Sequence, residues 1–300
     1  MTAPSFLFSL LIWPGVLGGS LYTWLLLWFQ RKLAARLQGR KGPPFYQPFF
    51  DFVKLAGKET VLPATVSRRM LYALPIISLI AVVSALALIP VPANPRPSFS
   101  GDMILLLYFL EAPVLCEVLA GFISRSPYAQ VGASRAAILS LGYNLPLLAA
   151  IISLAVRAKS LTIAAIAGLP IGPAHVAAAA AFLLALPACL KRNPFSIPNA
   201  EQEIVAGPLT EFSGVPLAIF ELAHGLELVA LVSLFFVLFI PVSGSVMIRF
   251  VAYGLTCFAV VSAATAVAVG TARVTVRQAF RFYWSWGAAA AGVSLLAAIW

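Results

Sequence analysis

Long apolar stretches, separated by short polar segments, recur along this chain of 300 residues. A helix needs about 20 mostly apolar residues to cross a bilayer. The length of the runs favours helices, because a helix satisfies its own backbone hydrogen bonds in lipid. The pattern therefore predicts an all-α, polytopic integral membrane protein with about eight spans, at roughly residues 5–29, 71–90, 102–122, 131–156, 161–190, 213–241, 246–270 and 279–300.

The fifth predicted span is the least regular of the eight. Gly168, Pro170, Gly172 and Pro173 interrupt its Ala-rich sequence. Proline removes a helix hydrogen bond and clashes with the preceding turn, and glycine makes helix formation entropically costlier. These residues are expected to kink or shorten the span.

Composition supports the same class of protein. Hydrophobic residues make up 61% of the chain and charged residues 10%, whereas soluble domains carry about 25% charged residues. The mean hydropathy is +0.97. No soluble domain and no internal repeat is evident, so residues 1–300 are expected to form a single membrane domain. The first run lacks a basic segment before it and is interpreted as a retained span, not a cleaved signal peptide.

Positive charge is divided unevenly between the two sides of the predicted bundle. With an external N-terminus, 16 of the 20 Lys and Arg residues fall in four segments, 30–70, 123–135, 191–212 and 271–281. The other side receives only Arg96, Arg157, Lys159 and Arg249. Cytoplasmic loops carry the basic excess in membrane proteins, so the four segments are predicted to be cytoplasmic. The net charge of +10 then reflects topology and anionic lipid, and nucleic acid is not expected as a partner.

The first basic segment contains an amphipathic pattern after a Gly-Pro-Pro turn. Phe49, Phe52, Val53 and Ala56 recur at helical spacing, while charged residues take another face. This predicts a short interfacial helix. Such a helix could serve as a simple membrane-surface anchor, or it could dock soluble partner subunits.

Four carboxylates and one histidine inside predicted spans are the candidate ion path. A carboxylate in mid-membrane costs about 2.5–3.5 kcal/mol on insertion scales, so it faces the bundle interior and is a functional candidate by default. In the sixth span, Glu221, His224 and Glu227 are three residues apart. Each step of three residues rotates the side chain by about 60° around the helix axis and moves it about 4.5 Å along that axis. The imidazole thus lies between two carboxylates, which suits a proton relay. The residues are Glu111, Glu117, Glu221, His224 and Glu227.

The same residues also have structural interpretations. An intramembrane glutamate can simply pair with an arginine of a neighbouring helix, and Glu117 and Arg135 lie at adjoining span ends where such a pair is possible. His175, alone in an Ala-rich span, is expected to be structural.

The cysteines do not suggest a metal or redox centre in this chain. Iron–sulfur and structural zinc sites need clustered thiolates. The three cysteines lie far apart in predicted spans without a CxxC motif, which favours apolar packing for Cys116, Cys189 and Cys257. Phosphate-loop, dinucleotide and Ser-His-Asp motifs are absent from the sequence. We therefore expect no catalytic residue, no metal and no cofactor in this chain.

Four segments carry a resemblance to a known family. The first runs from Arg31 to Glu59 and includes QGRKGPP and QP. The others are SPYAQVGASRAA (126–137), PFSIPNAEQEIVAGPLTEFSG (194–214) and, more weakly, ARVTVRQAFRFYW (272–284). In this order they resemble the subunit 1 family of respiratory complex I, called the H subunit in bacteria. The resemblance implies that these loops dock a peripheral redox arm, through Arg31, Lys32, Arg40, Lys41, Asp51, Lys54, Lys58, Glu59, Arg135, Glu201, Glu203 and Glu211.

Within this family the chain is most similar to the membrane subunit of group 4 energy-converting [NiFe] hydrogenases and formate hydrogenlyases, a branch shared by ferredoxin-linked, sulfur-reducing complexes. The short GPP-x-x-QP turn from Gly42 to Pro48, GASR at 132–135, and AEQEI followed by GPLTEFSG support this. The branch implies partners with iron–sulfur clusters and a [NiFe] centre, namely hydrogenase-like large and small subunits, an iron–sulfur subunit and antiporter-like membrane subunits in a cell membrane.

Several positions depart from the family pattern. Neutral or imidazole side chains replace expected carboxylates at Gln30, Asn144, Ser196, Asn199 and His224. Either the ion path has moved onto the five candidates above, or the subunit serves mainly as an anchor. Two other functions stay open: a quinone-site subunit of an NADH-quinone oxidoreductase, against which the short turn argues, and a free-standing secondary transporter, against which the lack of repeat symmetry argues.

Overall fold

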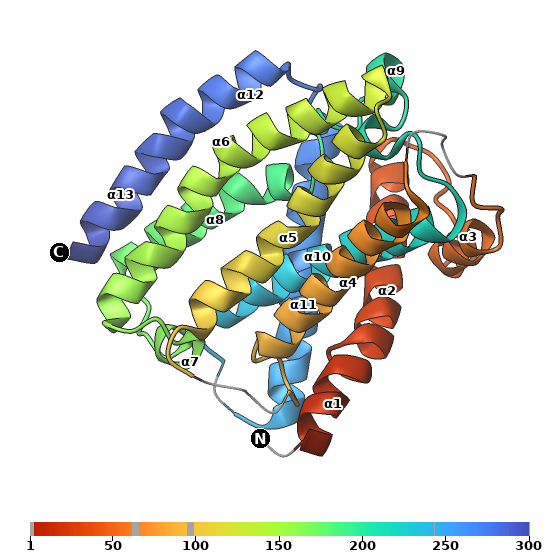
Figure 1. Ribbon diagram of the computed structural model, residues 1–300. Helices are drawn as coiled ribbons and strands as arrows, with labels where there is room; N and C mark the ends of the chain where they lie inside the picture. Colours follow the sequence, from red (N-terminus) through yellow and green to blue (C-terminus); the bar gives the residue numbers. More distant parts are fainter. Residues whose placement is uncertain (1–2, 62–65, 95–98, 243, 300) are drawn as a thin grey trace.

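The computed structural model describes residues 3–61, 66–94, 99–242 and 244–299, and all regular structure in these ranges is helical. Figure 1 shows the long helices running alongside one another. The helical elements, in chain order, are α1 (Ala3–Leu11), α2 (Val16–Leu37), α3 (Gln47–Ala56), α4 (Arg68–Leu88), α5 (Asp102–Ile123), α6 (Pro127–Ala158), α7 (Ile163–Ala167), α8 (Pro173–Cys189), α9 (Glu201–Ile204), the 3₁₀ helix η1 (Gly207–Leu209), α10 (Gly214–Phe239), α11 (Val246–Gly270), α12 (Val276–Phe282), the π-helix η2 (Tyr283–Gly287) and α13 (Ala288–Ile299).

Seven helical stretches in the described part of the chain are long and apolar enough to cross a membrane, which confirms an all-α, multi-pass membrane protein. The fifth expected span is different. It divides into α7, of five residues, and α8, of 17 residues. At about 1.5 Å per residue, α8 is about 25 Å long, shorter than a hydrocarbon core of about 30 Å. The break falls at the glycines and prolines predicted to shorten this span.

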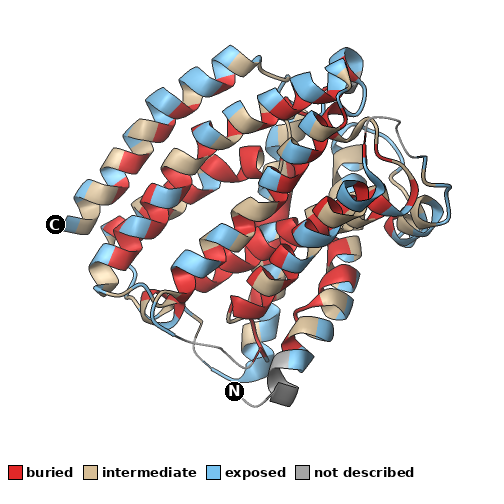
Figure 2. Ribbon diagram, in the orientation of Figure 1, coloured by how far each residue is buried: buried red, intermediate tan, exposed pale blue. Residues whose placement is uncertain are grey.

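Helix α10 forms the centre of the bundle. In its most apolar window 83% of the residues are buried, against 28% for α11 and 22% for the stretch of α12, η2 and α13. Figure 2 shows exposed residues along the outer helices and buried residues along α10. The exposed apolar surface of α11, α12, η2 and α13 is extensive enough to belong in lipid or against another membrane subunit. Polar side chains that α10 turns inward are therefore far from bulk water.

The basic segments meet at one end of the bundle, which we call the loop face: the described parts of residues 30–70, 123–135, 191–212 and 271–281. The backbone N–H of Val61 donates to Ser213 Oγ at 2.9 Å, and the N–H of Val274 donates to the carbonyl oxygen of Pro194 at 3.0 Å. In Figure 1, α7 and the start of α11 lie at the opposite end, whereas α3, α9 and the start of α12 lie at the loop face. Of the four basic residues expected on the other side, Arg96 lies outside the described residues.

The segment from 191 to 212 is packed tightly onto the helices beneath it. A Cβ at Gly132 of α6 would lie 2.6 Å from the backbone nitrogen of Pro208, in η1. A Cβ at Gly121 of α5 would lie 3.3 Å from the Cα of Pro208, as well as 2.7 Å from the carbonyl oxygen of Ala129 in α6. Only glycine permits such backbone approaches, so these two residues fix the height at which this segment lies over α5 and α6.

The predicted interfacial helix is present as α3. Its rings at Phe49 and Phe52 contact Trp24 of α2, with ring centroids 5.0 and 6.0 Å apart. Phe50, in contrast, is largely exposed, as expected for a helix at the membrane surface. The prediction of an amphipathic helix at this point of the chain is therefore confirmed.

Candidate functional site

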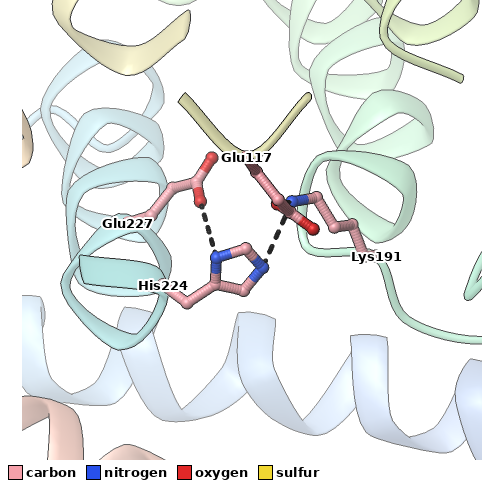
Figure 3. A network of polar contacts seen from close by, with 4 residues as sticks. All are labelled: Glu117, Lys191, His224 and Glu227. Atoms are coloured by element: carbon pink, nitrogen blue, oxygen red, sulfur yellow. Dashed lines mark hydrogen bonds and ion pairs between the residues drawn. The ribbon is translucent and has the colours of Figure 1, made fainter. Parts of the chain in front are cut away.

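A connected group of charged and polar side chains lies inside the bundle near the loop face (Figure 3). The ammonium of Lys191 forms an ion pair with Glu117 and lies 3.3 Å from His224 Nε2. On the other side of the imidazole, His224 Nδ1 lies 3.8 Å from Glu227 Oε2. We call Glu117, Lys191, His224 and Glu227 the buried network. It joins α5 and α10 to Lys191, which lies in the segment that follows α8.

Lys191 reaches this position because of the way in which α8 ends. Its backbone N–H donates to the carbonyl oxygen of Ala188 at 2.9 Å, and its φ of 49° is in the left-handed region. That conformation ends helices, although it is uncommon for residues other than glycine. It turns the long side chain back into the bundle, where only 3% of it is exposed. The ion pair with Glu117 compensates the charge that would otherwise be buried alone.

The contacts of Lys191 determine the hydrogen positions on His224. An ammonium can only donate, so His224 Nε2 must be the acceptor, and the hydrogen of a neutral imidazole must then be on Nδ1. Nδ1–H points toward Glu227, at a distance longer than an ordinary hydrogen bond. The network therefore has a direction, with the donor at Lys191 and the final acceptor at Glu227.

The remaining two ion-path candidates, Glu111 and Glu221, lie at the margins of the buried network. Glu111, one and two-thirds turns before Glu117 on α5, is half-buried and faces the side chain of Asn144 on α6. Tyr143, buried beside it, lies within electrostatic range of both Glu111 and Glu227. Glu221 is exposed, unlike the others, and contributes to two cavities. The structure thus brings four of the five candidates toward one region and gives Glu221 a different environment.

Two cavities lead from the loop face to the buried network. The larger, of about 260 Å³, lies between α2, α3 and α10 and is lined by Arg31, Asp51 and Glu221 among others. The smaller, of about 60 Å³, is lined by Arg192, Glu221, His224 and Glu227. Glu221 and Leu27 line both cavities. Glu221 therefore stands between a cavity at the loop face and the inner side of His224.

The expected pairing of Glu117 with Arg135 was wrong. Glu117 pairs with Lys191, and Arg135 Nη1 instead lies 2.6 Å from Glu203 Oε2. The segment that follows α8 supplies the cation that Glu117 contacts. Sequence reasoning counted Lys191 only as a loop charge, although its position directly after an apolar run was a sign that it could turn inward. His175 is buried, with Nε2 2.8 Å from the carbonyl oxygen of Leu238, which fits the structural role expected for it.

The docking candidates lie on the loop face. Arg31 Nη1 lies 2.5 Å from Asp51 Oδ2 and ties α2 to α3. Partial burial raises the pKa of Asp51, but hydrogen bonds from Arg31 and Gln47 outweigh it, so the pKa lies below its ordinary value. Lys32 and Glu211 are half-buried, and the side chain of Glu201 lies outside the described residues. Exposed side chains complete the set, at Arg40, Lys41, Lys54, Lys58, Glu59 and Glu203.

No group of three or more His, Cys, Asp or Glu side chains in the described residues could hold a metal ion. The cysteines at 116, 189 and 257 are free and buried, in agreement with apolar packing.

Comparison with known proteins defines the class. The family model described as NADH dehydrogenase matches residues 12–299, so the chain belongs to that family, which comprises subunit 1 of complex I and its bacterial counterpart, the H subunit. The H subunit of the NADH-quinone oxidoreductase of Syntrophotalea carbinolica is 34% identical over 231 residues, 70% of each chain. A chain in the structure of the membrane-bound sulfane sulfur reductase, an archaeal respiratory membrane complex, matches with a TM-score of 0.89 and 29% identity over 98% of this chain and 99% of that one.

The chain is therefore a membrane subunit of a complex I-like respiratory complex. Its relatives are subunits of multisubunit membrane complexes, which implies redox and membrane partners for it as well.

Proposed function

We propose that this chain couples electron transfer in a peripheral arm to ion translocation in the membrane, within the branch of complex I-like machines that includes energy-converting [NiFe] hydrogenases, formate hydrogenlyases and sulfur-reducing complexes. The single observation that carries the proposal is the buried network, a set of four ionisable side chains held together within the bundle. Ionisable groups are costly there and are functional candidates by default.

The branch assignment has two supports. The turn from Gly42 to Pro48 is short, as in hydrogenase-type members. The second support is the match to a chain of the membrane-bound sulfane sulfur reductase, with a TM-score of 0.89 and 29% identity over 98% of this chain. The electron chemistry then belongs to partner subunits with iron–sulfur clusters and a [NiFe]-type centre, docked on the loop face, with antiporter-like subunits beside the bundle.

The network can move one proton from Glu117 to Glu227. A proton that reaches the Glu117 carboxylate cancels its ion pair with Lys191. Lys191 then gives a proton to His224 Nε2 while Nδ1–H passes to Glu227, and Lys191 regains its proton from Glu117. Glu117 ends deprotonated and Glu227 ends protonated. The imidazole is left as the opposite tautomer and must reset before the next proton.

In this scheme Glu221 is the group through which Glu227 exchanges its proton with the loop face. It lines the cavity at the loop face as well as the cavity beside His224. A redox event on the docked arm changes the potential at the loop face, and buried groups such as those of the network are screened from such a change less than exposed ones. Each proton transfer is thus biased by the electron chemistry without any redox group in this chain.

A glutamine at position 221 tests the path. Glu221→Gln keeps the shape of the side chain but removes its proton chemistry, so ion translocation should fall while the complex assembles normally. Glu221→Asp, which keeps an ionisable carboxylate at the same position, is the matched control and should retain ion translocation. Unchanged translocation by the Glu221→Gln variant would remove this residue from the path.

Purification of the intact complex from native membranes tests the branch. Mass spectrometry should find a large subunit with two CxxC pairs together with antiporter-like subunits. A large subunit without these cysteines, accompanied by flavin and NADH-binding subunits, would instead assign the chain to the quinone-reducing branch.

One observation favours that second function. The cavity of about 260 Å³ between α2, α3 and α10 lies where a quinone headgroup would have to enter from the membrane surface. A quinone-site subunit predicts that turnover of the purified complex depends on added quinone, whereas our proposal predicts that it does not.

A further inference from the structure

One cavity in the described part of the chain has no place in the ion path. It measures about 580 Å³ and lies at the loop face between the start of α6, the segment from 191 to 212, and the start of α12. Three arginines line it, Arg135, Arg273 and Arg277, together with a single carboxylate, that of Glu203. The cavity thus carries an excess of two positive charges in its lining.

Most of this charge is available to a ligand. Arg135 is paired with Glu203, but Arg273 donates only from Nε, to Ser196 Oγ at 3.2 Å. Arg277 is exposed and forms no ion pair with any described residue. Guanidinium groups bind phosphate oxygens through paired hydrogen bonds, so two unsatisfied arginines on one cavity wall favour a phosphate group.

An apolar groove continues from this cavity toward the membrane. This groove is a shallow, exposed surface and not an enclosed cavity: Ile138 of α6 and Phe280 of α12, next to the cavity residues Arg135 and Val276, are 39% and 40% exposed. Farther along the same helical stretch, Trp284 and Trp286 are 54% and 69% exposed. Exposed tryptophans mark the level of the lipid headgroups. Arg277 lies about 10 Å nearer the loop face than Trp284 along this stretch, so a charged cavity there beside an apolar surface matches a molecule with an anionic head and an acyl chain.

We propose that this cavity binds the headgroup of an anionic phospholipid, with its phosphate on Arg273 and Arg277 and an acyl chain lying over the exposed apolar surface of α6 and α12. Basic pockets between membrane helices on the cytoplasmic side bind doubly charged lipid headgroups in this way. A lipid here would link the segment from 191 to 212, which holds Lys191, to the last helices of the bundle. The inference does not depend on the proposed ion path.

The test is the lipid content of the purified, intact complex. Wild-type complex should retain a tightly held anionic phospholipid after detergent exchange, and Arg273→Gln/Arg277→Gln complex should lose it. Arg281→Gln is the matched control, because Arg281 is exposed one turn later on α12 but does not line the cavity. Size-exclusion chromatography establishes that each variant complex is assembled.

A second measurement identifies the ligand. Anionic phospholipid in mixed micelles should raise the thermal stability of the wild-type complex but not that of the double variant, and phosphatidylcholine should have no such effect. Equal stabilisation by inorganic phosphate would show a free-anion site and overturn the proposal. Equal lipid retention by the double variant, or loss of a peripheral subunit from it with lipid retained, would also overturn it, and the latter would assign the arginines to a protein partner.

Discussion

Two of the ion pairs in the described part of the chain have a similar composition but lie in opposite environments. The side chains of Lys191 and Glu117 are 3% and 2% exposed, whereas those of Arg31 and Asp51 are 49% and 39% exposed. An exposed pair contributes about 0–1 kcal/mol. A buried pair costs several kcal/mol per ion to desolvate, which its attraction only partly returns. The difference teaches that stability alone does not explain Lys191 and Glu117, whereas the pair on the surface needs no function beyond holding α3 against α2.

Removal of one partner from the buried pair should give the largest effect. Lys191→Met leaves the carboxylate of Glu117 buried and uncompensated, which costs about 3–5 kcal/mol. Less assembled complex and a lower midpoint of thermal unfolding are expected. The double variant Lys191→Met/Glu117→Gln removes the cation and its partner anion together, so the net charge of the network is unchanged and most of the lost stability should be recovered. A single variant as stable as wild type would mean that the two groups are not charged together.

Glu227→Gln separates transport from stability. The amide fills the same space as the carboxylate beside His224 but cannot accept the relayed proton, so ion translocation should slow by at least about tenfold. The complex should assemble in normal amounts. Proton uptake by proteoliposomes is the measurement. Normal proton uptake by this variant would show that the proton path does not include Glu227.

Packing beneath the segment from 191 to 212 should be sensitive to one methyl group. In Gly132→Ala the new Cβ would lie 2.6 Å from a backbone nitrogen, and such overpacking costs about 1–3 kcal/mol. Gly254→Ala on α11 is the control, since a Cβ there meets nothing within 4 Å. The alanine control should be neutral or slightly stabilising. Equal unfolding midpoints for the two variants would contradict the tight contact of η1 with α6.

The exposed pair should give the smallest effect. Because the pKa of Asp51 is lowered in the folded protein, the pair stabilises α3 above the ordinary aspartate pKa, and this contribution is lost as the pH falls through the lowered value. At neutral pH, Arg31→Gln should therefore cost no more than about 1 kcal/mol, and less at high salt. Hydrogen exchange in α3, corrected for the intrinsic pH dependence of exchange, measures it. Weaker protection of α3 at pH 7 than at pH 3 in the wild type would contradict the predicted direction of this pH dependence.

The two environments also differ in how far the sequence predicts them. Membrane spans and the break at Gly168 to Pro173 follow from local composition, because apolar length and helix-breaking residues act over a few neighbours. The α3 helix likewise follows from periodicity. The partner of Glu117 does not, because Lys191 and Arg192 are adjacent and only the left-handed backbone at Lys191 decides which one turns inward. The exposure of Glu221 depends on cavities formed by α2 and α3, which no local pattern reports.

The most direct test of the coupling proposal is the ratio of ions moved to electrons transferred by the purified complex in proteoliposomes, compared between wild type and Lys191→Met/Glu117→Gln. The double variant leaves the net charge of the buried network and the loop face unchanged, so the docked arm should still transfer electrons. We predict that electron transfer continues while the ratio falls toward zero. An unchanged ratio in an assembled double-variant complex would contradict the account and leave the buried pair a structural role alone.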